Sequence, residues 1–115
     1  MISIADDKQI GARLSALADP TRRQIVEMLG REPRTATAIH EAFPIANPAV
    51  SRHLRVLRET GLVKEQRLPE DARVRLYTLE PEPLQDLSQW LGELSQMWQS
   101  QLDSFKDYLA LRKRG

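Results

Sequence analysis

The spacing of apolar positions predicts five helices and one pair of strands. The clearest helix runs from Asn47 to Gly61, where Val50, Leu54 and Leu57 recur at i, i+4 and i+7 and form one apolar stripe. The opposite side carries small residues and charges: Pro48, Ala49, Arg52, Arg55, Val56 and Glu59, with Ser51 on its shoulder. This pattern predicts a helix with one face in the core and a basic face outside.

Two helices are expected near the start of the chain. The first spans residues 6–18, with an inward face formed by Ile10, Leu14 and Leu17. Asp19 and Pro20 then begin a second helix, because Asp caps free amides and Pro suits the first helical position. This helix runs to about Leu29, and Gly30 is expected to end it.

A short third helix precedes the basic one. Thr35 is a good cap for a helix that ends near Phe43, and Ile39 would face inward with Phe43. The tight turn 44–46 then leads into the helix at Asn47. A short helix, a turn and a longer basic helix form a helix-turn-helix arrangement, whose second helix lies in the major groove of DNA.

After Gly61 the periodicity changes to alternation. Residues 62–67 and 73–79 are predicted strands, and the loop 68–72 between them contains Pro69 and Asp71. The sequence therefore predicts one β-hairpin in a mainly helical chain.

A long amphipathic helix is predicted over residues 83–112. Its apolar positions alternate at spacings of three and four, and burying about ten such side chains would contribute on the order of 15 to 30 kcal/mol. We expect a dimer interface in which this helix packs with helix 6–18 and a two-fold mate. The expected interface residues are Ile10, Leu14, Leu17, Leu87, Trp90, Leu91, Leu94, Trp98 and Phe105. A less favoured alternative is an aromatic ligand pocket formed by Trp90, Met97 and Trp98.

Composition limits the class of protein. The chain has 115 residues, 41% of them hydrophobic, and no cysteine, which predicts one domain without disulfides and agrees with a cytoplasmic location. Its acidic start is unlike a signal peptide, and no apolar run is long enough to suggest a membrane anchor. The net charge is only +1, but residues 47–79 carry seven basic and four acidic side chains. This local excess fits a phosphate contact surface, although it also fits a solvated face.

The outer face of helix 47–61 has the chemistry of a base-reading surface. Arg can bind guanine at two atoms, Asn can pair with adenine, and small residues such as Ala49 let the backbone approach base edges. Arg52 and Ser51 are expected to make most base-edge and nearby phosphate contacts. Asn47 is also the expected helix cap, and His53 could fill the edge of the core or contact a phosphate. The alternative is an ordinary surface helix with solvated charges.

Three segments together resemble the ArsR/SmtB family of bacterial winged-helix repressors. They are Ala16–Leu29 (ALADPTRRQIVEML), Asn47–Val63 (NPAVSRHLRVLRETGLV) and Arg75–Leu84 (RLYTLEPEPL). The resemblance implies an α+β winged helix-turn-helix fold of order α-α-α-α-β-β-α. It also implies one winged-helix domain over residues 1–115, in which helices 6–18 and 83–112 form the dimerisation part. A homodimer would bind double-stranded DNA at a palindromic operator, most simply as a repressor.

The resemblance extends the set of DNA-binding candidates. The hairpin becomes a wing, and Arg67, Arg73 and Arg75 could contact phosphates or the minor groove from its base, since Glu70 and Asp71 at the tip would repel DNA. Arg22 lies in a segment that is near the DNA backbone in such proteins, or it forms an internal ion pair with Glu27 or another acid. The full set is Arg22, Asn47, Pro48, Ala49, Ser51, Arg52, His53, Arg55, Arg67, Arg73 and Arg75.

Other functions are disfavoured by the residues present. Family metal sensors use thiolates or His and Asp pairs on the last helix, whereas this chain has no Cys and only His40 and His53, so we expect no metal and no cofactor. Ser51 and His53 are two positions apart on one helix and cannot form a nucleophile and base pair, which disfavours an enzyme. The remaining alternative is a winged-helix protein-interaction module that does not bind DNA specifically.

Overall fold

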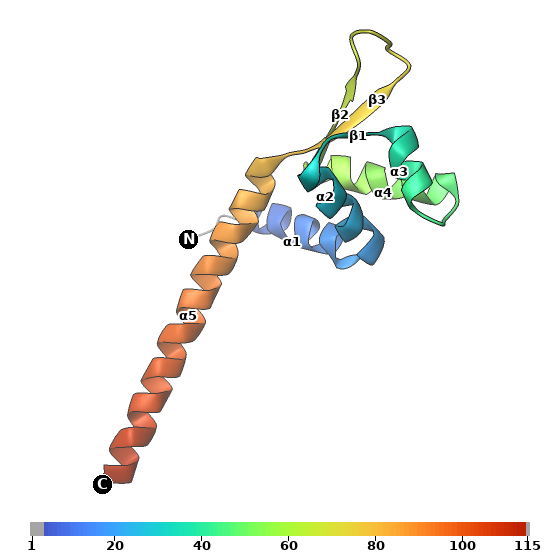
Figure 1. Cartoon of the computed structure of the whole chain (residues 1–115). Coiled ribbons are helices and arrows are strands. Elements are labelled where there is room, and N and C mark those ends of the chain that lie inside the picture. The colour runs from blue at the N-terminus through green and yellow to red at the C-terminus, as the bar shows by residue number, and fades with distance from the viewer. Residues whose placement is uncertain (1–3, 115) are drawn as a thin grey trace. The chain divides into compact units, whose positions relative to one another are not determined.

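The computed structural model describes residues 4–114, which divide into two compact units at Leu84 and Gln85. The first unit contains four helices and a small sheet, and the second continues the last helix (Figure 1). In chain order the elements are α1 (Ile4–Ala18), α2 (Pro20–Arg31), β1 (Arg34–Thr35), α3 (Ala36–Ala42), α4 (Asn47–Glu59), β2 (Val63–Arg67), β3 (Arg75–Leu79) and α5 (Pro81–Arg114). The predicted helices and hairpin are confirmed, with boundaries that differ by a few residues.

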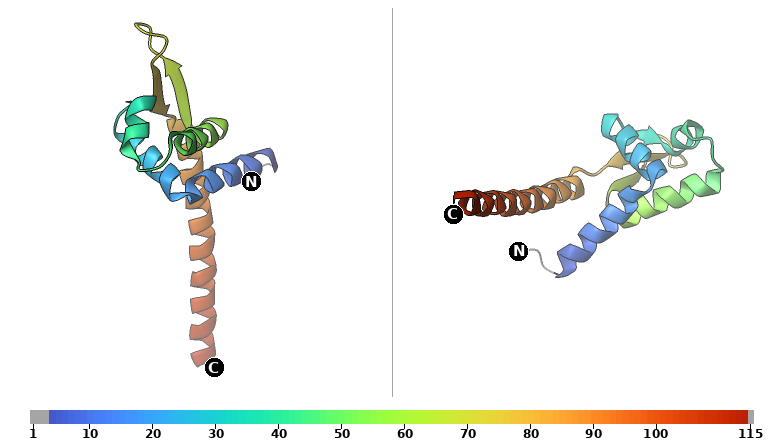
Figure 2. Two further views of the ribbon diagram at one scale, coloured as in Figure 1. Left: turned by 90° about the vertical axis from the view of Figure 1, so that its right-hand side faces the viewer. Right: turned by 90° about the horizontal axis from the view of Figure 1, so that it is seen from below.

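The sheet has one strand more than the sequence predicted. All three strands pair antiparallel in the order β1-β3-β2, with Arg34 opposite Tyr77 and Glu65 opposite Tyr77 on its other side. Strand β1 contains only two residues, which is too short to show an alternating pattern. The hairpin of β2 and β3 extends away from helices α1 to α4, as a wing does (Figure 2).

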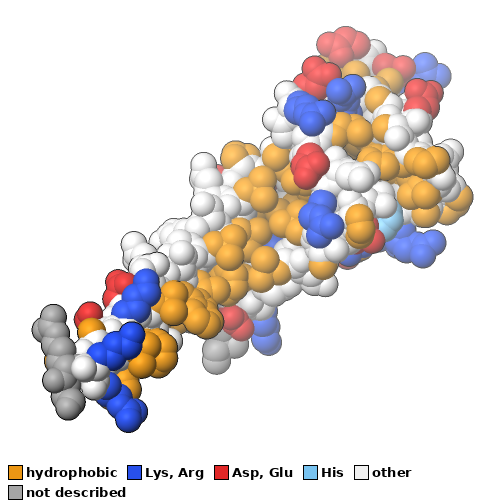
Figure 3. All heavy atoms as spheres, turned by 60° about the horizontal axis from the view of Figure 1, so that its bottom comes forward, with side chains coloured by type: hydrophobic (Ala, Val, Ile, Leu, Met, Phe, Trp, Pro, Cys, Tyr) orange, Lys and Arg blue, Asp and Glu red, His pale blue; other side chains and the backbone are white. Residues whose placement is uncertain are grey.

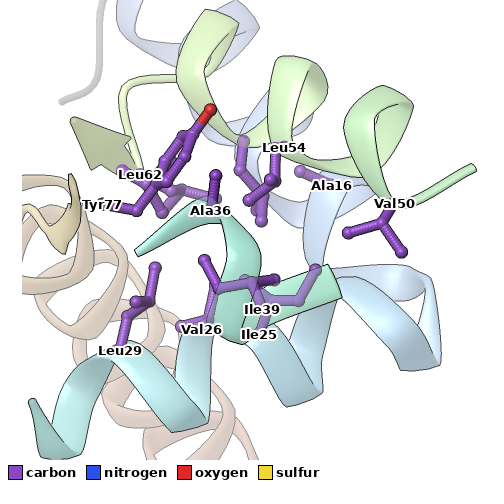
Figure 4. Close-up of a cluster of buried hydrophobic side chains, with 12 residues drawn as sticks. Ala16, Ile25, Val26, Leu29, Ala36, Ile39, Val50, Leu54, Leu62 and Tyr77 are labelled. Atoms are coloured by element: carbon purple, nitrogen blue, oxygen red, sulfur yellow. The ribbon is translucent and has the colours of Figure 1, made fainter. Parts of the chain in front are cut away.

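The core of the first unit lies between the helices and the sheet (Figure 4). Ile25, Ile39, Val50, Leu57 and Leu62 have no exposed surface. The stripes predicted for α2, α3 and α4 therefore face one another. The hydroxyl of the buried Tyr77 donates a hydrogen bond of 2.9 Å to Glu65, and its burial beside this carboxylate raises its pKa.

Two predicted helix caps are confirmed, and two predicted helix signals are wrong. Asp19 accepts a hydrogen bond from the Arg22 amide at 3.0 Å, and Thr35 Oγ1 accepts one from the Ala38 amide at 3.2 Å. Gly30 does not stop α2, which continues to Arg31.

Asn47 is not the cap of α4. The Ala46 carbonyl accepts the amides of Ala49 and Val50, at 2.9 and 3.3 Å, so Ala46 holds the cap position and makes no side-chain cap bond. Asn47 and Pro48 are therefore the first two helical residues, and the Asn47 side chain is not committed to capping.

Gly61 ends α4 and directs the chain into the wing. Its φ of 76° lies in the left-handed region that favours glycine. The Gly61 amide bonds the Arg58 carbonyl and the Leu62 amide bonds the Leu57 carbonyl, both at 3.0 Å, as in a Schellman motif. Because this turn places Leu62 in the core, β2 begins directly beside the end of α4.

The second unit is a helix that leaves much apolar surface open. Large side chains that are at least 41% exposed are Leu91, Met97, Trp98, Leu102, Phe105, Tyr108, Leu109 and Leu111. Figure 3 shows hydrophobic side chains along much of the visible face of this unit. None of the described helices combines the length and apolarity needed to cross a membrane.

Candidate nucleic-acid interface

Helix α4 separates its side chains as the sequence predicted. Val50, Leu54 and Leu57 are at most 2% exposed, whereas Ser51, Arg52 and Arg55 are exposed on the other side. Arg52 and Arg55 make no hydrogen bond or ion pair with any described side chain, while Arg58 is paired with Glu65. The outer face therefore presents two guanidinium groups whose donors are available. Val56 was placed on this face by the helical wheel, but it is half-buried and packs against the core.

The wing uses two of its arginines to close its own loop. Arg67 Nη1 donates to the Ala72 carbonyl at 3.0 Å, and Arg73 forms an ion pair of 3.1 Å with Asp71. The hydrogen bonds from the Arg73 side chain and amide hold the pKa of Asp71 below its ordinary value. Asp71 therefore does not present an uncompensated negative charge at the tip.

Positive charge lies where the two strands of the wing meet its loop. Arg67 and Arg75 are directly opposite each other on β2 and β3. Like charges at such paired positions destabilise a hairpin, and a nearby polyanion would relieve the repulsion. The sequence placed these arginines at the base of the wing, but the register puts them at its loop end, while Val63 and Leu79 form the pair at the base.

Arg22 and Arg23 cap the end of α1. Arg22 donates from Nε to the Ala16 carbonyl at 2.7 Å and from Nη2 to the Ser15 carbonyl at 3.3 Å. Arg23 donates to the carbonyls of the last two α1 residues, at 3.3 and 3.4 Å. The last carbonyls of a helix are an acceptor site for cations, which explains two arginines at the start of α2. Of the two alternatives for Arg22, the internal ion pair with Glu27 or another acid is not formed among the described residues.

Known proteins with related sequences are named as transcriptional regulators. A helix-turn-helix domain family matches residues 17–66. The transcriptional repressor SdpR of Bacillus subtilis is 34% identical over 66% of this chain and 81% of its own length. The HTH-type transcriptional regulator Rv2034 of Mycobacterium tuberculosis is 38% identical over 78% of each chain.

Solved structures show the same relationship. An ArsR family transcriptional regulator superposes with a TM-score of 0.76 at 31% identity, over 87% of this chain and 98% of that one. This chain belongs to the ArsR family. It is a DNA-binding transcriptional regulator with a winged-helix fold.

In this ArsR-family regulator His53 joins a polar cluster with residues of α2. Its side chain is 20% exposed, and its Nδ1 lies 3.3 Å from Arg22 Nη1 and 3.8 Å from Asp19 Oδ2. The hydrogen bond from the Arg22 amide is the main cause that lowers the pKa of Asp19, and the positive charge of the Arg22 guanidinium adds to it. Sequence reasoning missed this cluster, because more than thirty positions separate His53 from its partners.

No metal centre was expected for this regulator. Within residues 7–113, whose side chains the structure describes, no three His, Asp or Glu side chains lie close enough together to hold a metal ion.

Proposed function

We propose that this regulator binds an imperfect palindromic operator as a homodimer and represses transcription there. The observation that carries the proposal is the pair of exposed arginines on α4, Arg52 and Arg55, which no described side chain neutralises. A guanidinium group on a helix that fits the major groove can read guanine. Repression is proposed because SdpR is named a repressor.

The remaining DNA contacts follow the position of α4. Asn47, Pro48, Ala49 and Ser51 occupy its first turns, where recognition helices approach base edges. Arg67 and Arg75, at the loop end of the wing, would reach the flanking backbone or minor groove. Because Asn47 does not cap the helix, its amide group is available to a base.

The homodimer is supported by the apolar face of α5. Leu84, Leu91, Trp98 and Phe105 are spaced by seven, as are Leu87 and Leu94, which is the spacing of a helix seam between two copies. Within the proposed interface, Leu14, Leu91, Trp98 and Phe105 are exposed, while Ile10 and Leu87 are already buried. The exposed members would therefore contribute most to association. Leu17, Trp90 and Leu94 are partly exposed and complete the interface.

The geometry of a symmetric dimer sets the form of the operator. Two α4 helices related by a two-fold axis would enter successive major grooves about 34 to 36 Å apart. Each half-site should thus contain the same short sequence in inverted orientation.

The test is a selection of random duplex DNA against the purified full chain, followed by binding measurements at several salt concentrations. We expect a palindromic site bound roughly a thousandfold or more tightly than random DNA, with log affinity falling steeply against log salt. Analytical ultracentrifugation in the same buffers should give two chains per duplex. Absence of any enriched sequence, or one chain per duplex, would contradict the proposal.

A further inference from the structure

Arg22 contacts three helices at once. It is part of α2, it donates two hydrogen bonds to the carbonyl end of α1, and its Nη1 lies 3.3 Å from His53 Nδ1 on α4. An arginine whose role is to bind DNA phosphates would keep its N–H donors free for solvent or DNA. Arg22 instead directs several of them to groups of its own chain.

The partner atoms determine the state of the His53 ring. A guanidinium group has only donors, so the hydrogen bond at 3.3 Å requires an unprotonated Nδ1 that accepts. The ring proton is then on Nε2. This atom makes no hydrogen bond with a described residue and is not among the buried unpaired side-chain atoms, so it reaches solvent.

The contact with Asp19 requires the opposite ring state. Asp19 Oδ2 lies 3.8 Å from His53 Nδ1, which is beyond hydrogen-bond distance, and it already accepts the Arg22 amide. The shorter distance to Arg22 therefore favours the neutral ring that accepts from the guanidinium.

We propose that Arg22 is a positioning residue that fixes the recognition helix α4 against α1 through His53. The proposal rests on the function proposed above, in which α4 reads the operator and α1 belongs to the dimer interface. A second contact also connects α1 with α4, since Arg13 Nε of α1 donates a hydrogen bond of 3.3 Å to the Thr60 carbonyl at the end of α4. Holding α4 at two points makes its orientation depend on α1, and hence on assembly of the dimer.

Two substitutions at His53 separate positioning from direct phosphate contact. His53→Asn places an amide oxygen near the position of Nδ1, so it can accept from Arg22 but lacks Nε2. His53→Gln can place an amide N–H near the position of Nε2, so it retains an outward donor but loses the acceptor for Arg22. We expect His53→Asn to bind the selected operator within about threefold of wild type and His53→Gln to bind roughly tenfold more weakly.

Arg22→Lys and Arg23→Lys provide the matched pair. Both retain the positive charge, but only Arg22 contacts His53. We expect Arg22→Lys to lose roughly tenfold in the ratio of operator to random-DNA affinity, with an unchanged salt slope, and Arg23→Lys to match wild type. Thermal unfolding of each variant confirms folding, and if Arg22→Lys fails to fold, the His53 pair carries the test.

A DNA-free measurement tests the contact itself. Nitrogen-15 NMR of the His53 ring at neutral pH should show an unprotonated Nδ1 and a protonated Nε2, and Arg23→Lys should leave this pattern unchanged. A proton on Nδ1 would overturn the inference, as would His53→Gln binding like wild type while His53→Asn does not. If wild type selects no operator, the proposed function fails instead, and the NMR result still decides the contact.

Discussion

Helices α4 and α5 have similar amphipathic patterns but use their apolar faces differently. On α4, Val50, Leu54 and Leu57 are buried within the first unit, with exposed fractions of 0 to 2%. On α5, Leu91, Trp98 and Phe105 remain 51 to 61% exposed in the single chain. Periodicity therefore predicts which side of a helix will be covered, but it does not say whether the same chain supplies the cover.

The polar faces of the two helices show the reverse difference, because polar groups are bonded to one another on α5 but not on the described outer face of α4. On α5, Gln89 bonds Glu93 and Gln99 bonds Asp103, so polar groups satisfy one another along the helix. On α4, the arginines of the outer face have no such partners among the described residues. Among the described residues, the apolar face of α5 and the arginines on the polar face of α4 thus both lack partners in the single chain.

The largest expected effect comes from the apolar face of α4. Leu57→Ala should destabilise the first unit by about 2 to 5 kcal/mol, because it leaves a cavity at a fully buried site. Chemical denaturation at low protein concentration would measure this loss. Leu109→Ala, at a position of α5 that is 41% exposed, is the matched control and should change the unfolding free energy under these conditions by less than about 1 kcal/mol. Equal losses in the two variants would break the comparison.

The apolar face of α5 should instead control association. Trp98→Glu should weaken the dimer by about 2 to 4 kcal/mol, or roughly thirtyfold or more, because a charge replaces a large aromatic side chain in the proposed seam. Sedimentation equilibrium measures the dissociation constant. Gln96→Glu adds the same charge on the polar side of α5 and should leave the constant within about threefold of wild type. A tight dimer in Trp98→Glu would place the interface elsewhere.

The polar face of α4 is tested by removing one guanidinium. Arg52→Ala should cost about 1 to 3 kcal/mol on the selected operator and relax specificity at one base pair, with little change in fold stability because the side chain is exposed. Competition binding against operator variants measures both effects. Arg31→Ala removes an exposed arginine from the end of α2, outside the proposed interface, and should bind as wild type does. Unchanged affinity in Arg52→Ala would remove this residue from base readout.

The fold could be predicted largely from the sequence because its signals are local. The stripe on α4, the caps at Asp19 and Thr35 and the glycine at position 61 each act within a few residues, and each is found in the structure. Errors arose where local signals compete. Asn47 has a good capping side chain, but the turn before it leaves the cap position to Ala46.

The interface was less predictable because its details depend on contacts between distant segments. The sequence identified the exposed arginines of α4, since their exposure follows from the helical wheel. It could not show that Arg22, which caps α1, also reaches His53 on α4, more than thirty positions away. The tertiary structure is thus needed to tell which arginines are bonded within the chain and which have donors available to DNA.

The smallest expected effect is on how the unfolding free energy of the first unit changes at low pH. The Asp19 pKa is below its ordinary value, so this group stabilises the fold above about pH 4 and loses that contribution as the pH falls through the lowered value. Asp19→Asn retains a good cap but does not titrate, so it should be less stable than wild type by under about 1 kcal/mol at pH 7, with the difference shrinking as the pH falls through the lowered pKa of Asp19. Urea unfolding from pH 7 to pH 2 measures this difference. The control is Asp103→Asn, which removes a carboxylate from α5 and should leave the pH dependence of the first unit's stability as in wild type. If Asp103→Asn weakens that pH dependence as Asp19→Asn does, the acid sensitivity is not a local property of the α2 cap.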